Sequence, residues 1–156
     1  MSSFVGRWFA RTKSLWRRAL EENASPAKFA WAVAGGAFIS AGPFYGLRTG
    51  GAYVLAWGTK LNRLTTVLSS HILSGPFGVA AVVYEVRLGS MLLRRPAPAW
   101  PSSAAAALDL AKHALLAWVL GGLIVAPFFA ALAGLIAYPI AKAWRARKER
   151  AEASKV

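Results

Sequence analysis

The sequence predicts an all-α integral membrane protein, and three observations carry this prediction. Hydrophobic residues make up 56% of the 156 residues although the formal net charge is +13, a pairing that is rare in water-soluble globular proteins. Lys, Arg, Asp and Glu are absent from residues 29–47, 64–84 and 114–141. A membrane-spanning helix needs about 20 mostly apolar residues, so the first two runs approach this length and the third exceeds it.

Residues 1–24 are predicted to form an interfacial amphipathic helix, because apolar and basic residues alternate there at helical spacing. The aromatic face, which includes Trp8, Phe9 and Trp16, can enter the headgroup region while the cations meet anionic lipid. The same pattern is typical of a cleaved organelle presequence. The predicted membrane-surface residues are Arg7, Arg11, Lys13, Arg17 and Arg18.

Residues 25–95 are predicted to form a membrane core with two Pro-broken helical hairpins. Ser25 and Pro26 suit the N-cap and first position of a helix. A small residue, Pro and Phe then recur near the middle of each apolar region, and an internal proline removes a backbone hydrogen bond, so each triplet should kink or break its helix. The triplets are Gly42-Pro43-Phe44, Gly75-Pro76-Phe77 and Ala126-Pro127-Phe128.

The basic residues indicate how these regions lie in the membrane. Clusters follow the three regions at residues 60–63, 94–95 and 145–150, and the positive-inside rule places each on the cytoplasmic side. This favours re-entrant hairpins over kinked full spans for the first two regions, with both termini cytoplasmic. Residues 96–113 are expected to form a linker and short helix. Residues 114–144 either cross once, form a hairpin or make one long kinked helix, and 145–156 form a basic cytoplasmic tail.

The same clusters argue against nucleic acid as a partner. Eight of the nineteen Lys and Arg residues flank apolar segments, so we expect anionic membrane lipids to be the partner. The chain has no cysteine, only two histidines and six acidic residues, which excludes disulfides and thiolate sites and disfavours a zinc site. No Gly-rich phosphate loop follows a strand pattern. We therefore expect no cofactor and no enzymatic activity.

Several ordered motifs resemble a known bacterial membrane family. They are Gly36-Ala37-Phe38-Ile39, Pro43-Phe44-Tyr45-Gly46-Leu47-Arg48-Thr49, Leu61-Asn62-Arg63 and Arg87-Leu88-Gly89. Over about residues 26–95 the chain resembles domain of unknown function 2062. The resemblance implies the bacterial inner membrane as location and implies no particular biochemistry. Members usually carry Gln or His at the position of Arg48, and Asn-Pro at Gly75-Pro76.

Arg48 is the most informative candidate site residue, because a charge within a membrane region is costly. It lies five positions past Pro43, near the start of a predicted half-helix whose N–H groups and dipole favour an anion such as phosphate. Broken helices hold ligands in this way in transporters. The predicted ligand-binding residues are Arg48, Pro43, Gly46, Thr49, Gly75, Pro76, His71 and Glu85.

Structural roles remain open for the same residues. Arg48 could reach an interface or pair with Glu85, the one acid of the predicted membrane core. Glu85 is also a candidate proton-coupling carboxylate. His71 belongs to a polar stripe that either satisfies backbone groups between helices or relays protons.

Two functions follow from this sequence. The first is binding or transport of an anionic lipid or other phosphate-bearing ligand through the broken helices. The second is a non-catalytic accessory or scaffold subunit of a larger membrane complex, which packs through its Gly and Ala faces. A homo-oligomer, or a place as a subunit of a larger membrane complex, is expected, because one chain of this size offers little shelter to a polar path.

Overall fold

The computed structural model describes residues 14–16, 18–21, 25–44, 46–94, 96 and 104–154, with backbone alone for 104–113. Within these ranges the chain is helical and has no strand, which confirms the all-α prediction. Arg18 is exposed in the helical stretch 18–21. The other predicted membrane-surface residues, Arg7, Arg11, Lys13 and Arg17, lie outside the described residues.

Helix α2, Pro26–Ala41, begins where the sequence predicts. Ser25 is its N-cap, with the side-chain oxygen accepting a 3.2 Å hydrogen bond from the backbone N–H of Lys28. Pro26 occupies the first turn, where no backbone donor is needed. The helix ends at Ala41 because Gly42 is extended and Pro43 cannot continue the hydrogen-bond ladder.

The first two Pro triplets break the chain into separate helices, as predicted. After Pro43 the chain turns, and α3 runs over Arg48–Thr59. A second turn leads into α4, Arg63–Ser69, which Asn62 caps. After the second triplet α5 runs over Pro76–Leu92. Gly75 precedes it with φ of 70°, a left-handed conformation that glycine adopts at little cost.

The third triplet behaves differently, because α6 is one continuous helix over Ala104–Ala153 that contains both Pro127 and Pro139. The helix is not broken at Pro127, so of the forms predicted for residues 114–144 the hairpin is wrong and the structure has one long helix. Each internal proline removes one backbone hydrogen bond, and the packing of α2 and α5 along the same helix offsets that loss. The 50 residues of α6 extend about 75 Å at 1.5 Å per residue. The segments expected separately at 96–113, 114–144 and 145–156 are therefore joined by this helix.

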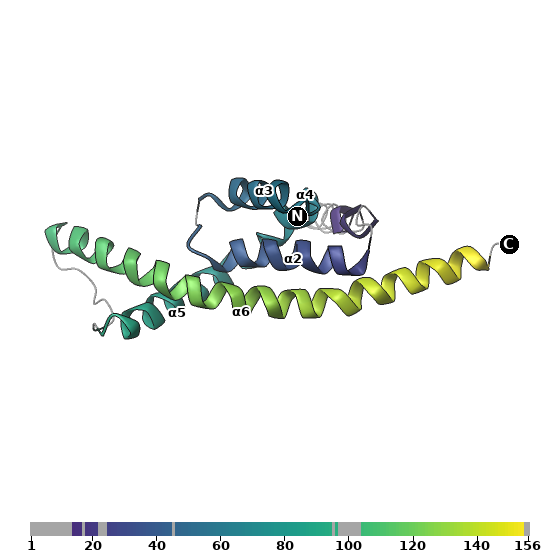
Figure 1. Cartoon of the computed structure of the whole chain (residues 1–156). Helices are drawn as coiled ribbons and strands as arrows, with labels where there is room; N and C mark the ends of the chain where they lie inside the picture. Colours follow the sequence, from purple (N-terminus) through teal and green to yellow (C-terminus); the bar gives the residue numbers. More distant parts are fainter. Residues whose placement is uncertain are drawn as a thin grey trace, which may run out of the picture.

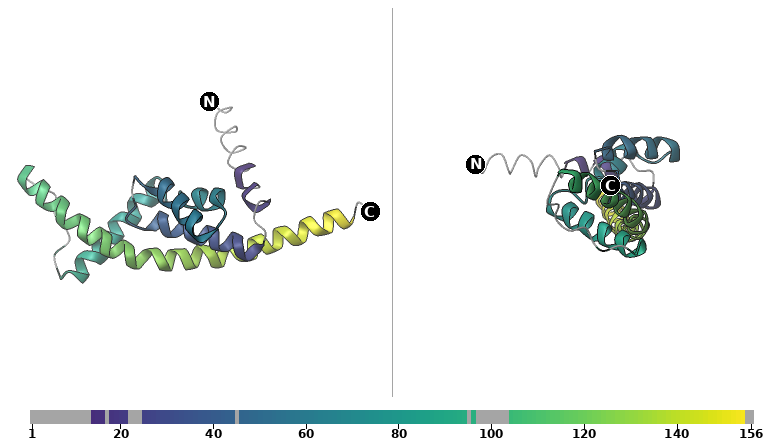
Figure 2. Two further views of the ribbon diagram at one scale, coloured as in Figure 1. Left: turned by 45° about the horizontal axis from the view of Figure 1, so that its top comes forward. Right: turned by 90° about the vertical axis from the view of Figure 1, so that its left-hand side faces the viewer.

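Helix α6 supports the other helices along its length (Figure 1; Figure 2). Its C-terminal half packs on α2, where Phe29 and Val33 meet Ala137 and Ala141 in one buried cluster. Its N-terminal half packs on α5, with Gly89 directly against the backbone of Ala117. The hydrophobic core is thus divided between the α2–α6 contact and the α5–α6 contact, which lie next to each other along α6.

Only the first of the two predicted hairpins is formed as a helix pair. Helix α3 returns along α2, and Gly51 faces the Ile39 side chain. Helix α4 packs on α2 and α3, whereas α5 leaves this group and packs along α6. The second Pro break therefore joins two helices with different partners, so α4 and α5 do not form the expected hairpin.

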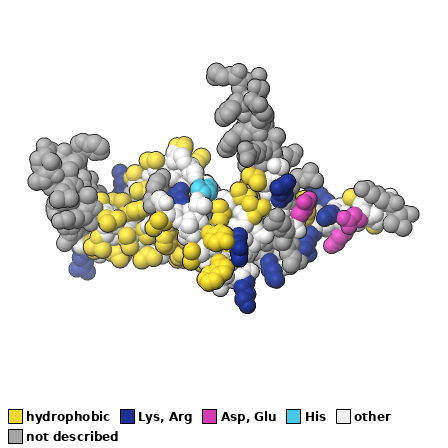
Figure 3. All heavy atoms as spheres, turned by 90° about the horizontal axis from the view of Figure 1, so that it is seen from above, with side chains coloured by type: hydrophobic (Ala, Val, Ile, Leu, Met, Phe, Trp, Pro, Cys, Tyr) yellow, Lys and Arg dark blue, Asp and Glu magenta, His cyan; other side chains and the backbone are white. Residues whose placement is uncertain are grey.

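The surface of the molecule is apolar over much of its length. Large side chains such as Trp57, Phe77 and Phe128 are 67%, 73% and 75% exposed. Among the described helices, one segment is long and apolar enough to cross a membrane, Ala114–Ala153 in α6. Figure 3 shows hydrophobic side chains over the half of the molecule that holds α5, with Lys and Arg gathered toward the C-terminal half of α6. These features are compatible with membrane association.

Candidate anion-binding cavity

A cavity of about 200 Å³ lies where the two Pro-broken segments meet. Five of the eight predicted ligand-binding residues line it together, although they come from separate turns of the chain. Ser74 also contributes to the wall. The predicted residues in the lining are Gly46, Arg48, Thr49, His71 and Gly75.

Arg48 is the first residue of α3 and the one charged side chain in the lining. Its Nη1 donates a 2.8 Å hydrogen bond to the carbonyl oxygen of Leu73, 25 residues further along the chain. This bond is charge-assisted and partly buried, so it is stronger than a contact between neutral groups. Arg48 therefore ties the start of α3 to the turn that precedes α5.

Two further hydrogen bonds hold the same turn in place. The Oγ of Ser40, near the end of α2, accepts a 2.9 Å bond from the backbone N–H of Leu73. Thr49 Oγ1 lies 3.2 Å from His71 Nε2, and the tautomer of the imidazole decides which group donates. The turn after α4 is thus hydrogen-bonded to both α2 and α3, and these bonds hold the residues that line the cavity in place.

The N-terminal ends of α3 and α5 border the cavity, since Arg48 and Thr49 open α3 while Ser74 and Gly75 immediately precede α5. Neither helix start receives a side-chain capping hydrogen bond. Helix starts present N–H groups and a partial positive charge, which favour anions. With Arg48 present and no acidic side chain in the lining, the cavity is suited to a phosphate or carboxylate.

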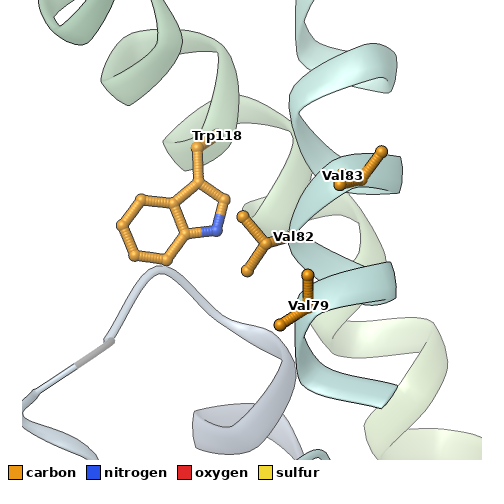
Figure 4. A pocket seen from close by; sticks show the side chains of 4 residues that line it. All are labelled: Val79, Val82, Val83 and Trp118. Atoms are coloured by element: carbon orange, nitrogen blue, oxygen red, sulfur yellow. The ribbon is translucent and has the colours of Figure 1, made fainter. Parts of the chain in front are cut away.

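Glu85 lies outside the cavity lining, at the crossing of α5 and α6. It is 2% exposed, and its Oε2 accepts a 2.7 Å hydrogen bond from the Trp118 indole. The charge of Arg48 acts on the Glu85 carboxylate through space. In Figure 4 the Trp118 side chain of α6 lies beside Val79 and Val82 of α5, where an apolar cavity of about 350 Å³ is found.

Pro43 and Pro76, the two prolines of the predicted set, adjoin different parts of the site. Pro43 lies against Gly122 of α6, where an added Cβ would sit 3.2 Å from the proline Cδ and 3.5 Å from Glu85 Oε2. Pro76 starts α5 next to the cavity residue Gly75. The predicted set is therefore divided between the cavity and the adjoining Glu85 site.

The family model described as "Uncharacterized protein conserved in bacteria (DUF2062)" matches residues 9–150. The chain belongs to this family. The match extends well beyond the segment 26–95 on which the sequence resemblance rests, and it takes in almost all of α6. No curated protein and no solved structure matches this DUF2062 chain significantly.

Besides Ser74 of the cavity wall, three participants in this site were not among the site residues predicted for this DUF2062 chain. Trp118 is of a type that suits membrane interfaces, yet it lies next to the small residues Gly121 and Gly122, a hint of a close helix contact. Ser40 stands as a polar residue within an apolar run. The backbone carbonyl of Leu73 could not be predicted from the sequence, because every residue has such a carbonyl. In the described part of the chain no cluster of three or more His, Asp or Glu side chains could hold a metal ion.

Proposed function

We propose that this DUF2062 protein is an integral protein of the bacterial inner membrane that binds an anionic lipid or another phosphate-bearing ligand in the cavity at Arg48. The observation that carries the proposal is the meeting of two uncapped helix starts and one guanidinium around a cavity without acidic residues. Binding at such a broken-helix site is also the first step that transport would require.

Membrane insertion is supported by the surface of the helices. The apolar segment of α6 has a mean hydropathy of 2.4, and 17% of its most apolar stretch is buried within the chain. Exposed side chains such as Leu135 at 73% and Phe128 at 75% need an apolar surrounding. The charge-free residues 114–141 rise about 42 Å, which exceeds about 30 Å of hydrocarbon, so α6 crosses with a tilt.

The helix contacts support one crossing by α4 and α5 together and a second crossing by α6. The start of α4 lies with the C-terminal half of α6, because Leu64 packs on the cluster that contains Ala141. Helix α5 continues from the turn toward the other end of α6, where Gly89 meets Ala117. The α2–α3 pair is then the re-entrant hairpin, and both termini share the cytoplasmic side.

In the proposed arrangement the cavity lies about midway across the membrane, between the two basic ends. A phosphate group there meets the Arg48 guanidinium, the two helix starts and the hydroxyl groups of Thr49 and Ser74. Charge-assisted hydrogen bonds of this kind are strong where water is scarce. The apolar remainder of a lipid can stay in the bilayer, because the apolar faces of α3 and α5 are exposed next to the cavity.

Thermal unfolding of the purified full chain in an uncharged detergent tests the proposal, with inorganic phosphate and short-chain phosphatidylglycerol as separate probes. Saturating ligand at about 100 times its Kd should add about 2.7 kcal/mol to the free energy of unfolding. We expect Arg48→Ala to abolish the stabilisation, whereas the matched control Arg87→Ala, an exposed arginine outside the cavity lining, keeps it. Stabilisation by phosphate alone indicates a soluble anion, and stabilisation by the lipid alone indicates a headgroup.

The contacts of Arg48 also favour a second candidate, a non-catalytic scaffold subunit. Its hydrogen bond to the Leu73 carbonyl gives the guanidinium a structural role within the fold. A scaffold predicts that Arg48→Ala lowers the unfolding temperature without changing the response to either probe. It also predicts a stable foreign subunit after gentle purification from the native membrane.

A further inference from the structure

A second concave surface lies away from the Arg48 cavity, along the side of α6 that faces α2. It is an apolar groove of about 450 Å³. One wall is a stripe of α6 residues at spacings of three and four, from Phe129 to Ile140. Phe29 and Val33 of α2 form the facing wall, and no charged side chain lines the groove.

The side chains of the described residues leave this groove open. Phe29 and Val33 are each 5% exposed and form part of a firm floor, whereas Leu132, Ile136 and Ile140 on the rim are 55%, 54% and 55% exposed. Its volume falls in the range of about 300 to 1,000 Å³ that is usual for small-molecule sites. The groove therefore has room for an apolar chain that lies along α6.

Residues that line one end of the groove have basic neighbours in the sequence. Trp16 and Leu20, which line it there, pack with Phe29 and Ala141 into the same apolar cluster. Three exposed cations stand directly beside residues of this cluster in the sequence, each in a separate segment, and Glu21 is an exposed acid three positions after the first of them. The cations are Arg18, Lys28 and Lys142. The other end reaches Ile72 and Phe129 and is apolar.

We propose that this groove binds one acyl chain of an anionic phospholipid, whose phosphate headgroup lies among Arg18, Lys28 and Lys142. An apolar groove with cations at one end matches an amphiphile with a negative head in both shape and charge. A second copy of the chain fits poorly, because it carries nineteen basic and six acidic residues and would bring further positive charge to this end. The bound lipid belongs to the cytoplasmic leaflet if the basic end of α6 is cytoplasmic.

This site is independent of the proposed Arg48 cavity. His71 lines the cavity whereas its neighbour Ile72 lines the groove, and the two sites have no lining residue in common. Loss of one ligand therefore leaves the other in place. Failure of the phosphate proposal and failure of the groove proposal are distinguishable by which variants change lipid retention.

Native mass spectrometry of the full chain in an uncharged detergent tests the groove, with phosphatidylglycerol and phosphatidylcholine of identical acyl chains as probes. Ile136→Trp places an indole in the groove, and Leu135→Trp places one at a neighbouring position that is 73% exposed and does not line it. We expect Ile136→Trp to lose retained phosphatidylglycerol, while Leu135→Trp and Arg48→Ala keep the adduct assigned to the groove.

The headgroup contacts are tested by charge reversal at Lys28 and Lys142. The double variant Lys28→Glu, Lys142→Glu should lower the preference for phosphatidylglycerol over phosphatidylcholine roughly tenfold, because anionic headgroups are attracted by nearby cations. The control Arg147→Glu, Arg150→Glu reverses two exposed cations further along α6 and should change the preference little. Equal retention by Ile136→Trp and Leu135→Trp, or equal loss of preference in both double variants, overturns the proposal.

Discussion

The indole nitrogen of Trp118 donates a 2.7 Å hydrogen bond to Glu85 Oε2, which joins α6 to α5 at the point where the first Pro break also meets them. Glu85 is 2% exposed, and a buried carboxylate is tolerated only where hydrogen bonds and charge support it. The Arg48 guanidinium contributes the nearby positive charge. The contact therefore couples helix packing to the candidate site.

Trp118→Phe should lower the free energy of unfolding by about 1 to 3 kcal/mol, since the buried carboxylate loses a donor while the aromatic packing is largely kept. In a Glu85→Leu background the same change should cost much less. A double-mutant cycle in detergent measures this coupling, which is about 0.5 to 3 kcal/mol for residues in one hydrogen-bond network. Equal costs in the two backgrounds would show that the bond contributes little.

The crossing of α5 and α6 depends on glycine at position 89. A Cβ built at Gly89 would lie 1.8 Å from the carbonyl oxygen of Ala117, so Gly89→Ala must push the helices apart, and we expect a loss of about 1 to 3 kcal/mol. Gly58 of α3 is the matched control, because nothing lies within 4 Å of its added Cβ. Gly58→Ala should be neutral or stabilising by up to about 1 kcal/mol. Thermal unfolding of both variants checks this prediction.

The proposed membrane arrangement predicts which residues face the outside. The chain has no cysteine, so single-cysteine variants report one position each. Arg94→Cys, beyond the end of α5, should react with a membrane-impermeant maleimide on intact spheroplasts. Lys60→Cys and Arg147→Cys should react only after the membrane is permeabilised. Labelling of Arg94→Cys only after permeabilisation would contradict the proposed crossing by α4 and α5 and place this cluster on the cytoplasmic side.

Pro127 should lower the free energy of unfolding relative to alanine at the same position in α6. Proline in a helix interior is about 3 kcal/mol less favourable than alanine, and Pro127 lies within α6. We expect Pro127→Ala to raise the unfolding temperature. Pro26→Ala is the control, because Pro26 is in the first turn of α2 and removes no helical hydrogen bond there. A fall in stability for Pro127→Ala would show that the fold requires a local distortion at this position.

Much of the candidate cavity was predictable because its residues follow local rules. Proline interrupts a helix or starts one whatever the tertiary structure around it. The residues after Pro43 and Pro76 were therefore expected near helix N-termini. The structure brings Arg48, Thr49, His71 and Gly75 together in the lining of one cavity, and their role in ligand binding stays a prediction. Glu85, which belongs to the same predicted ligand-binding set, lies at the α5–α6 crossing rather than in the cavity lining.

The amino-acid sequence by itself determined the helical class, the start of α2 at Ser25 and Pro26, and the breaks at the first two Pro triplets, because each depends on backbone chemistry within a few residues. Only the tertiary structure decided that α5 leaves α4 for α6, that Trp118 meets Glu85, and that α6 continues through Pro127. Those outcomes depend on which small-residue faces come into contact. Gly and Ala faces occur on several helices of this chain, so their pairing is settled by the fit of whole helices rather than by local pattern.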